Sequence, residues 1–552
     1  MARRQEMISS LSQSFDLMII GGGITGVGAA RDAARRGLQV VVVEMQDLAY
    51  GTSSRSSKLV HGGLRYLEKA EFSLVFESVS ERRVLMDIAP HLVNPLGFLF
   101  PVYKSSRRGV FTINLGMWVY DTLSLFRSPK IHRNVSAKEI ETLEPALNRT
   151  DLRGAPLYYD CSTDDARLTL ETALDAADNG AVIATYARVV GLLRSENGRV
   201  VGARVRDEMT GEEMSVSAAS VINATGPWSD RTRALGSGGA PQLRPTKGVH
   251  IVVDSERLQL SNAVVCFHPT DGRVLFAIPW GDRTYVGTTD TDYSGDPGEV
   301  AADGDDVRYL LEAANHYFPD AELVEDDVIS TWAGLRPLIS EEGSADASAV
   351  SREHSIRVDP DGLITIAGGK LTTYRRMGAE VVDKAIDMLR LTGAVSGKLR
   401  PAATNTEPLP GAIGWPESDD HEAVMRMVMK KGGQAITEDI ARNLANTYGM
   451  RGLDVAEMVA ADPELGVRLV EGRPEILAQV EYAVRRELAA TVRDVMIRRT
   501  QLFFRDRDQG LTATPAVAAR MARVLDWNEE RETMEVLAYQ AEVARSRQWR
   551  ED

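Results

Sequence analysis

Residues 21–26, Gly21-Gly22-Gly23-Ile24-Thr25-Gly26, have the spacing of a loop that binds a nucleotide phosphate. Gly21 permits a tight turn, Gly23 lets the backbone approach a pyrophosphate, and Gly26 lets a helix pack closely on a sheet. The helix N-terminus then offers unpaired N–H groups to the phosphate. Glu44 follows at a spacing that suits an acid binding ribose hydroxyls. A glycine turn without a ligand does not explain this acid, so the pattern predicts a dinucleotide cofactor.

A hydroxyl-rich loop at residues 51–58 favours FAD over NAD. Its polar side chains are suited to hydrogen-bonding a ribityl–pyrophosphate tail; they include Thr52, Ser53, Ser54, Ser57 and Lys58. Two later strand-like segments end in glycine turns, at Thr225-Gly226 and at Gly368-Gly369. Distant strands that return to one cofactor suit FAD, because FAD spans more of a sheet. Either turn alone is also explained as an ordinary glycine turn that ends a strand.

The elements around the glycine loop form a βαβ unit. Residues 15–20 are a short apolar strand, residues 24–36 a helix, and Gly37 stands where a helix cap belongs. Residues 40–43 are all valine, as in a buried parallel strand. Residues 186–217 contain three β-rich stretches separated by the turn signals Asn197-Gly198 and Thr210-Gly211. This pattern predicts a small meander attached to the nucleotide-binding sheet.

Two further domains are expected beyond this unit. Strand-like segments at residues 249–253, 274–278 and 284–287 indicate a second sheet. Prolines at 401, 408 and 410 mark a linker. Beyond it, Val484, Leu488, Val492 and Val495 recur at helical spacing, so the last part of the chain is interpreted as a helical domain.

Composition excludes several classes of protein. The chain has 552 residues and a formal net charge of -15, which argues against a nucleic-acid partner. Two cysteines, Cys161 and Cys266, make neither a disulfide framework nor a redox-active pair close in sequence. No apolar run has the length of a membrane span, and residues 1–14 lack an apolar signal core. We expect a cytoplasmic enzyme of several domains with no metal site.

Several motifs resemble those of the FAD-dependent glycerol-3-phosphate dehydrogenase family. They lie at residues 56–68, 278–280, 287–290, 334–338 and 368–375. The resemblance implies an α/β fold like that of D-amino-acid oxidase: a Rossmann-like FAD-binding domain, an interleaved antiparallel β-sheet substrate domain and a C-terminal all-α domain. The FAD-binding parts are expected at about 14–95, 155–245 and 340–395, and the substrate parts at about 96–154 and 246–339. A linker at 401–411 leads to the helical domain at 412–552.

The resemblance also implies a reaction: oxidation of glycerol 3-phosphate to dihydroxyacetone phosphate, with FAD as cofactor and a membrane quinone as acceptor. A phosphorylated substrate requires cations, and arginine binds phosphate through two parallel hydrogen bonds. By similarity, the substrate residues are Arg65, Tyr66, Arg336, Arg352 and Lys370. A surface ion pair is the commoner role of a single arginine, but Arg65 and Arg336 each lie beside glycine in a compact motif. Lys370, at a helix N-terminus, is suited to stabilise negative charge on reduced flavin.

The remaining residues assigned to FAD complete the site. They are His61, Gly62, Gly63, Trp228, Gly334, Gly369, Leu371, Thr372 and Thr373, beside the glycine loop, Glu44, the hydroxyl loop and Thr225-Gly226. The proton of the substrate hydroxyl needs an acceptor. His250 is the candidate general base, because histidine titrates near neutrality. A hydrogen-bonded strand histidine with no catalytic role is the alternative, and Arg336 and Lys370 are the other candidate catalytic residues.

Residues 104–133 have the pattern of a membrane-surface segment. Phe111, Leu115, Trp118, Val119 and Phe126 recur at near-helical spacing between basic ends, which fits binding to an anionic membrane surface on the inner face of the cell membrane. A buried helix with solvated ends is the alternative.

Three functional alternatives also stay open: an oxidase that passes electrons to oxygen and makes hydrogen peroxide, a flavin-dependent modification enzyme and a non-catalytic flavin-binding protein. The oligomeric state, including a homodimer, is open as well.

Overall fold

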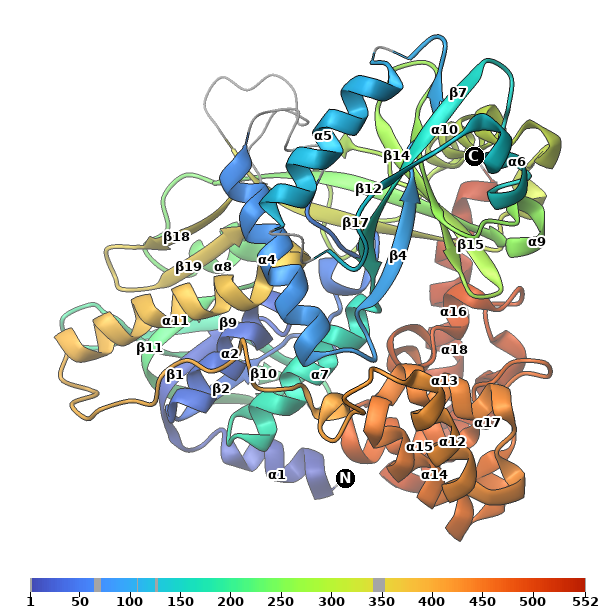
Figure 1. Ribbon diagram of the computed structural model, residues 1–552. Helices are drawn as coiled ribbons and strands as arrows, with labels where there is room; N and C mark the ends of the chain where they lie inside the picture. Colours follow the sequence, from blue (N-terminus) through green and yellow to red (C-terminus); the bar gives the residue numbers. More distant parts are fainter. Residues whose placement is uncertain (1, 64–70, 107, 125–127, 341–352, 552) are drawn as a thin grey trace.

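The computed structural model describes residues 2–63, 71–106, 108–124, 128–340 and 353–551. It contains a mainly parallel sheet, a mainly antiparallel sheet and a C-terminal group of helices (Figure 1). We call these three parts the parallel-sheet domain, the antiparallel-sheet domain and the C-terminal domain. The predicted fold class, a Rossmann-like α/β domain with an interleaved antiparallel sheet and an all-α C-terminal domain, is confirmed.

The parallel-sheet domain is built on the strand order β18-β19-β11-β1-β2-β8, with β10 beside β11 and β9 beside β10. Neighbours from β19 to β8 pair in parallel, and β18 pairs antiparallel with β19. The strands are β1 (Ser14–Ile20), β2 (Val40–Val43), β8 (Val182–Ala184), β9 (Ala187–Arg194), β10 (Val200–Asp207), β11 (Glu213–Asn223), β18 (His354–Val358) and β19 (Ile364–Gly368). The helices are α1 (Ala2–Ser10), α2 (Ile24–Arg36), α4 (Phe72–Ile88), α7 (Asp165–Asp178), α8 (Ser229–Arg233) and α11 (Tyr374–Leu391).

Each strand at the centre of this sheet contributes to two apolar cores. Leu17 and Ile19 of β1 belong to the core under α2, α7 and α11, whereas Met18 and Ile20 belong to the core under α1 and the meander β9–β11. This alternation follows from the two-residue period of a strand, and it explains why the strand is apolar throughout. The predicted meander is confirmed, and so is the predicted helix, which ends at Gly37 with φ 96°.

The antiparallel-sheet domain has the strand order β16-β12-β15-β14-β13-β4-β7-β3, with β17 beside β12 and with β5 and β6 beside β7. The strands are β3 (Leu59–Val60), β4 (Asn94–Leu99), β5 (Val102–Tyr103), β6 (Arg133–Val135), β7 (Leu152–Ser162), β12 (Leu243–Asp254), β13 (Ala263–Phe267), β14 (Val274–Trp280), β15 (Arg283–Gly287), β16 (Thr291–Asp292) and β17 (Ser330–Ile339). The helices are α5 (Val110–Leu123), α6 (Ala137–Leu143), α9 (Ser255–Leu258) and α10 (Gly304–Tyr317). The strands predicted at 249–253, 274–278 and 284–287 lie within β12, β14 and β15.

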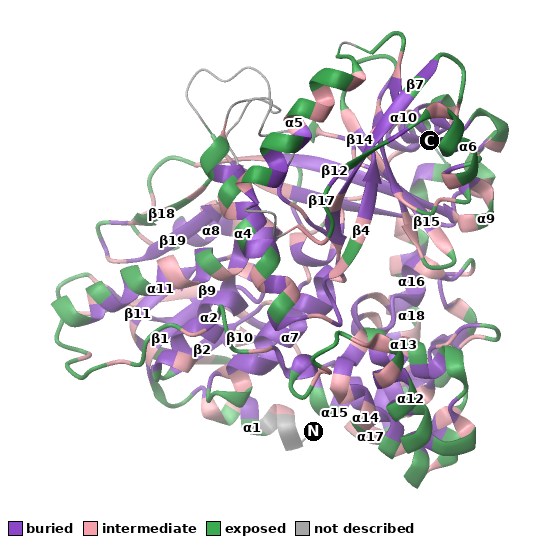
Figure 2. Cartoon of the chain, in the orientation of Figure 1, coloured by how far each residue is buried: buried purple, intermediate pink, exposed green. Residues whose placement is uncertain are grey.

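The C-terminal domain is helical. The apolar cluster at its centre differs from the cluster through which it packs on the antiparallel-sheet domain. Its helices are α12 (His421–Gly432), α13 (Glu438–Tyr448), α14 (Gly452–Ala461), α15 (Leu477–Arg486), α16 (Leu502–Arg505), α17 (Thr514–Leu525) and α18 (Glu529–Ser546). Helices α12 to α15 share one buried cluster. Phe503 and Phe504 instead join a cluster with Trp332 and Tyr285 of the antiparallel-sheet domain. Figure 2 shows buried residues continuing from the sheets into these helices.

The helical spacing of apolar residues at 484–495 does not correspond to one continuous helix. Helix α15 ends at Arg486, and Leu488 has a φ of 62°, in the left-handed region. A π-helical turn, Asp494–Arg499, begins six residues later. The carboxylate of Asp494 accepts hydrogen bonds from the backbone N–H groups of Ala490 (2.9 Å) and Thr491 (3.0 Å). These bonds hold the chain in a non-helical bend that apolar spacing does not reveal.

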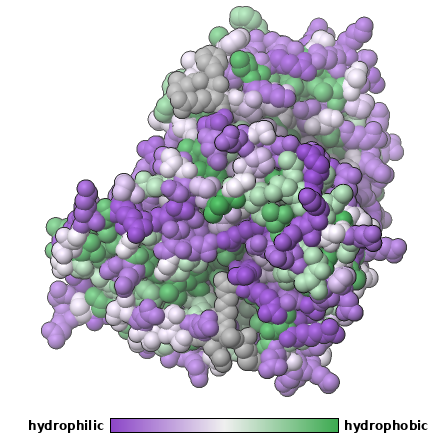
Figure 3. Space-filling model, turned by 60° about the horizontal axis from the view of Figure 1, so that its bottom comes forward, coloured by the Kyte–Doolittle hydropathy of each residue, from purple (hydrophilic) through white to green (hydrophobic). Residues whose placement is uncertain are grey.

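No helix in the described ranges is long and apolar enough to cross a membrane. On the face turned forward in Figure 3, apolar side chains lie scattered among hydrophilic ones.

Candidate functional site

A cavity at the edge of the parallel sheet, which we call the large cavity, has a volume of about 510 Å³. It crosses the carboxyl ends of four neighbouring parallel strands, β19, β11, β1 and β2. This edge of an open parallel sheet is where α/β proteins bind nucleotides. Neighbouring strands are about 4.8 Å apart, so the cavity extends over roughly 14 Å across the sheet. An elongated ligand fits this span.

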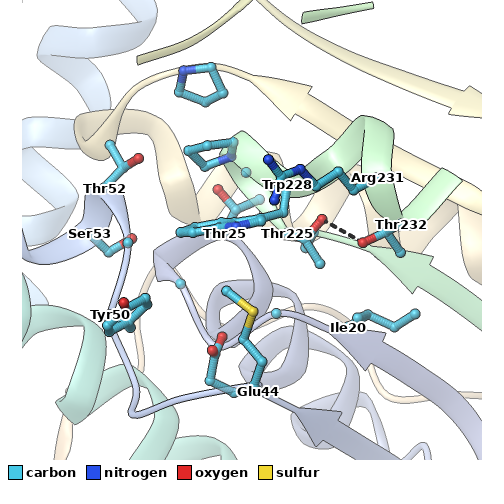
Figure 4. A pocket seen from close by; sticks show the side chains of 18 of the residues that line it. Ile20, Thr25, Glu44, Tyr50, Thr52, Ser53, Thr225, Trp228, Arg231 and Thr232 are labelled. Carbon is cyan, nitrogen blue, oxygen red and sulfur yellow. Dashed lines mark hydrogen bonds between the residues drawn. The ribbon is translucent and has the colours of Figure 1, made fainter. Parts of the chain in front are cut away.

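The glycine turn forms one wall of the large cavity (Figure 4). Gly21 has a φ of 113°, and a Cβ there would lie 2.6 Å from the carbonyl oxygen of Ala224. A Cβ at Gly26 would overlap the carbonyl oxygen of Gly21, so α2 packs directly on the turn. The N–H of Ile24, at the start of α2, donates to Ser53 Oγ at 2.9 Å. The hydroxyl loop and the helix N-terminus therefore meet at this wall.

Glu44 lies at the end of β2, on the floor of the same cavity. Its carboxylate accepts hydrogen bonds from the N–H groups of Gly22 (2.6 Å) and Gln46 (2.9 Å). Burial raises the pKa of Glu44, although both of these bonds oppose the shift. The acid is thus fixed beside the glycine turn, as a ribose ligand would require. Tyr50 lies close to it in Figure 4 and also lines the cavity.

The hydroxyl loop, residues 51–58, runs from the large cavity to a second one. Thr52 Oγ1 donates to the carbonyl oxygen of Leu335 at 2.6 Å. Ser57 Oγ lies 2.9 Å from His250 Nε2. Lys58 faces away from both cavities: its Nζ donates to Asp165 Oδ1 at 2.6 Å and to the carbonyl oxygen of Ser54. The loop therefore carries residues for two sites.

The second cavity, which we call the small cavity, has a volume of about 170 Å³. It shares part of its wall with the large cavity: Thr52, Gly369, Lys370 and Leu371. Its other lining residues are Arg55, Ser56, Ser57, Leu59, His61, Gly248, His250, Thr288, Gly334, Leu335, Arg336 and Thr372. A molecule held in the small cavity would contact the end of a ligand held in the large one.

His250, on β12, is buried against aromatic rings. Its ring stacks on Trp332, with centroids 4.6 Å apart and planes at 14°. Nδ1 has no hydrogen-bond partner among the described residues. Burial lowers the pKa of His250 well below its ordinary value, and the positive charges of Arg336 and Lys58 lower it further. The imidazole is therefore neutral at pH 7.

Arg336, on β17, is held in a fixed orientation beside His250. Its guanidinium donates to Asp290 Oδ1 (3.0 Å) and to Thr288 Oγ1 (3.1 Å). Lys370 caps the segment that leads into α11 and lines both cavities. Two cations thus line one small cavity in an acidic protein. That arrangement suits a small anion.

The predicted site residues that the structure describes fall into three groups. Those on the large cavity are Gly21, Gly23, Ile24, Thr25, Glu44, Thr52, Ser53, Thr225, Gly226, Trp228, Gly369, Lys370 and Leu371. Those on the small cavity include Ser57, His61, His250, Gly334, Arg336 and Thr372. Gly26, Ser54, Lys58, Gly62, Gly63 and Thr373 lie outside the residues that line the two cavities. Arg65, Tyr66 and Arg352 lie outside the described residues.

Lys58 and Gly62, which are predicted to bind FAD, make contacts with other parts of the protein. Lys58 is drawn to Asp165 because a buried ammonium needs a carboxylate. The N–H of Gly62 donates to Asp160 Oδ1, and a Cβ at Gly62 would overlap Tyr120 of α5. Their assignment to the FAD site stays a prediction.

Sequence reasoning missed several residues at these cavities. Tyr50, Arg188 and Arg231 line the large cavity, and Arg55 and Thr288 line the small one. Arg55 lies in the hydroxyl loop and Thr288 in the motif at residues 287–290, so local sequence signals mark both. Arg188 and Arg231 lie outside every motif described above, so the residues around them do not indicate a role in binding.

The fold and the large cavity together define an FAD-dependent oxidoreductase. The matching family model, described as FAD dependent oxidoreductase, covers residues 16–383, and the model for the C-terminal domain of alpha-glycerophosphate oxidase covers 402–532. An aerobic glycerol-3-phosphate dehydrogenase of Bacillus subtilis is 39% identical, over 96% of this chain and 94% of its own. A glycerol-3-phosphate dehydrogenase of Synechocystis is 38% identical, over 95% and 96%.

A solved structure agrees with these relatives. The glycerol-3-phosphate dehydrogenase of Bacillus halodurans, complexed with FAD, has a TM-score of 0.81 and 34% identity, covering 99% of this chain and 97% of its own. The chain belongs to the family of FAD-dependent glycerol-3-phosphate dehydrogenases. Its cofactor is FAD, which fits the glycine cradle, the acid and the long span of the large cavity. Among the described residues, no group of three or more His, Cys, Asp and Glu side chains is arranged to bind a metal ion.

Proposed function

We propose that this protein oxidises glycerol 3-phosphate to dihydroxyacetone phosphate in the small cavity. The observation that carries the proposal is the pairing of two cations, Arg336 and Lys370, with a neutral histidine in a cavity that shares a wall with the cofactor cavity. The names of the relatives above support this choice of substrate. FAD, when bound, supplies the acceptor for the hydride from C2.

Arg336 and Lys370 would bind the phosphate group. The Arg336 guanidinium is already oriented by Asp290 and Thr288, so little side-chain entropy is lost when it binds an anion. Lys370 adds a second charge without a fixed geometry. Its position at the N-terminal end of the helical segment also favours negative charge at that end of the large cavity. Arg65, Tyr66 and Arg352 remain proposed substrate ligands.

His250 would accept the proton of the C2 hydroxyl at Nε2. The neutral imidazole has the right protonation state, but the low pKa makes it a weak base in the free protein. A phosphate bound at Arg336 would offset the positive charge that lowers this pKa. Substrate binding therefore strengthens the base where it is needed. Ser57 Oγ, 2.9 Å from Nε2, holds the ring in place until the substrate hydroxyl arrives.

Anaerobic reduction of the flavin tests the proposal. Glycerol 3-phosphate should bleach the flavin absorbance of the oxidised protein, while glycerol at the same concentration should not. His250→Gln should reduce the rate of bleaching at least 100-fold and leave FAD bound. His268→Gln is a matched control, because His268 lies against Tyr309 in the antiparallel-sheet domain, away from the lining of either cavity. Equal rates of bleaching in the two variants would reject His250 as the base.

We also propose that a membrane quinone accepts the electrons and that α5 contacts the anionic membrane surface. Phe111 (81% exposed), Leu115 (57%) and Trp118 (50%) project from α5, and Phe72 and Phe76 at the start of α4 are about half exposed. The lysine and arginine side chains of Lys104, Arg108 and Lys130 around them are exposed. Exposed apolar side chains framed by basic ones are typical of helices that lie in a membrane interface. Arg107 and Phe126 lie outside the described residues.

Vesicle flotation tests the membrane contact. The double variant Phe111→Ser, Trp118→Ser should lose most of its binding to vesicles of anionic lipid. The control variant Met534→Ser, Leu537→Ser removes two similarly exposed apolar residues from α18 and should float like the wild type. Equal flotation of both variants would reject α5 as the contact. The acceptor is tested separately: a quinone should restore turnover, whereas stoichiometric peroxide in air would identify an oxidase.

A further inference from the structure

A buried carboxylate forms one of the contacts between the C-terminal domain and the wall of the cofactor cavity. Asp47 lies three residues after Glu44, in the segment that lines the large cavity, and its side chain is fully buried. Its Oδ2 accepts hydrogen bonds from Arg498 Nε (2.6 Å) and Arg499 Nη1 (2.9 Å), and its Oδ1 accepts one from Arg499 Nη2 (2.9 Å). Both arginines belong to the C-terminal domain, more than 450 residues away in the chain.

The two arginines lie on the π-helical turn Asp494–Arg499. Asp494 Oδ1 accepts hydrogen bonds from Arg498 Nη2 (2.8 Å) and from the Tyr186 hydroxyl (2.7 Å). Arg499 Nη2 also donates to the carbonyl oxygen of Glu487. Single π-helical turns inside helical regions are rare and concentrate at functional sites. Here the turn places adjacent arginines on one carboxylate.

The same turn also contacts the segment from Glu44 to Tyr50 indirectly, through Tyr186. Tyr186, which bonds to Asp494, donates its backbone N–H to the carbonyl oxygen of Gln46 at 2.9 Å. The next residue, Ala187, donates to the carbonyl oxygen of Glu44 at 2.7 Å. Arg498 also lies 5.9 Å from the ring centroid of Tyr50, which lines the large cavity. The segment from Glu44 to Tyr50 is therefore held on both sides by groups that the C-terminal domain orients.

Asp47 depends on these arginines for its charge. Burial raises the pKa of its carboxyl, but the charges of Arg499 and Arg498 outweigh burial and hold the pKa below its usual range. Without them, a fully buried carboxylate would be left without a counter-charge, and the loop would have to move to hydrate it. A shift of this loop would displace Glu44 and Tyr50 from the cavity wall.

We propose that Arg498 and Arg499 are positioning residues for FAD, so that the C-terminal domain completes the cofactor site by fixing residues 44–50. The inference rests on the assignment of the large cavity to FAD and does not depend on which substrate is oxidised. Coupling between two sites is reciprocal. FAD therefore binds more tightly when the turn is docked, and the turn docks more tightly when FAD is bound.

Titration of the FAD-free full-length protein with FAD tests the proposal. Arg499→Gln should raise the dissociation constant for FAD at least 10-fold, while kcat at saturating FAD should stay within 2-fold of the wild type. Arg499→Lys, which keeps the charge, should recover part of the affinity. The double variant Asp47→Asn, Arg499→Gln should bind FAD no more weakly than the weaker of its single variants.

Arg473→Gln is the matched control. Arg473 is also a buried arginine of the C-terminal domain, but it pairs with Asp282 of the antiparallel-sheet domain. Its substitution should change the dissociation constant for FAD less than 3-fold. An equal loss of FAD affinity in Arg473→Gln and Arg499→Gln would overturn the proposal, since general undocking of the domain would explain both. An unchanged FAD affinity in Arg499→Gln would overturn it as well.

Hydrogen exchange of the wild-type protein supplies a test that needs no variant. Adding FAD to the FAD-free protein should slow amide exchange of the turn Asp494–Arg499, which lies outside the lining of the large cavity. Exchange of α13, whose buried residues belong to a different apolar cluster from those of the turn, should change little. Equal exchange of the turn with and without FAD would overturn the proposal, even if the substrate assignment holds.

Discussion

Substitution of His91 should make the protein less sensitive to acid. His91 follows α4 and is fully buried where the parallel-sheet domain meets the C-terminal domain. Its ring lies against Gly411 and Gly449, at which a Cβ would come too close to the imidazole, and 5.8 Å from Trp415. Neither ring nitrogen has a hydrogen-bond partner among the described residues. Burial, followed by the charges of Arg167 and His421, lowers the pKa of His91 to about 3.

The sign and size of the effect follow from this pKa. The folded-state pKa lies below the unfolded value of about 6.5, so between the two values only the unfolded chain binds the proton. The free energy of unfolding therefore falls as the pH drops below about 6.5, by about 1.4 kcal/mol per pH unit. Between pH 7 and pH 5, His91 should cost the wild-type protein about 2 kcal/mol of stability.

Urea unfolding of the wild type and of His91→Leu, each at pH 7 and pH 5, measures this cost. Leucine cannot titrate, so the variant should lose about 2 kcal/mol less stability than the wild type on acidification. Leucine also packs differently against the two glycines, at a cost of about 1–3 kcal/mol, but that cost is the same at both pH values and cancels in the comparison. Equal acid losses, within about 0.5 kcal/mol, would refute a buried neutral His91.

Three further predictions concern the cavities. In the free protein, the acid limb of kcat/KM should lie well below pH 6.5, because His250 acts as a base only when neutral and its pKa is lowered. Arg336→Gln removes one of the positive charges that lower this pKa, so the acid limb should move to higher pH. Gly26→Ala should weaken FAD binding at least 10-fold and destabilise the protein by about 1–3 kcal/mol, as measured by FAD titration and thermal unfolding. Arg336→Lys keeps the charge but removes the two guanidinium hydrogen bonds to Asp290 and Thr288. Stopped-flow flavin reduction should therefore show at least a 10-fold rise in the apparent substrate dissociation constant.

The nucleotide-binding unit could be predicted because its signals are local. The glycine turn, the valine strand and Glu44 fall within one stretch of about 30 residues, the length of a βαβ unit. Gly26 is also required by its position, because a Cβ there would overlap the carbonyl oxygen of Gly21. The same holds for the meander, whose turns carry Asn-Gly and Thr-Gly pairs.

The parts of the site that could not be predicted depend on contacts between distant residues. The residues around Asp47 in the sequence do not indicate that it pairs with Arg499, and those around Lys58 do not indicate that it pairs with Asp165. The break in the helical path around Leu488 has a different, local cause. Its apolar spacing is real, but the carboxylate of Asp494 bonds to the preceding backbone and ends the helical path. Apolar spacing reports a helical preference, and a bond between a side chain and the nearby backbone overrides it here.

The C-terminal domain is attached in two chemically different ways, and the difference has a physical consequence. Phe503 and Phe504 pack with Trp332 of the antiparallel-sheet domain in an apolar cluster, whose stabilisation depends on buried area and little on direction. The contact with the cofactor loop is made instead by buried charges such as Asp47 and Arg499, which cost desolvation and add little net stability over an apolar contact of the same size. Charged hydrogen bonds do, however, have a defined geometry. The apolar cluster thus holds the domain in place, and the ionic contact sets the position of the loop. Substitutions at the ionic contact should therefore change cofactor affinity before they release the domain.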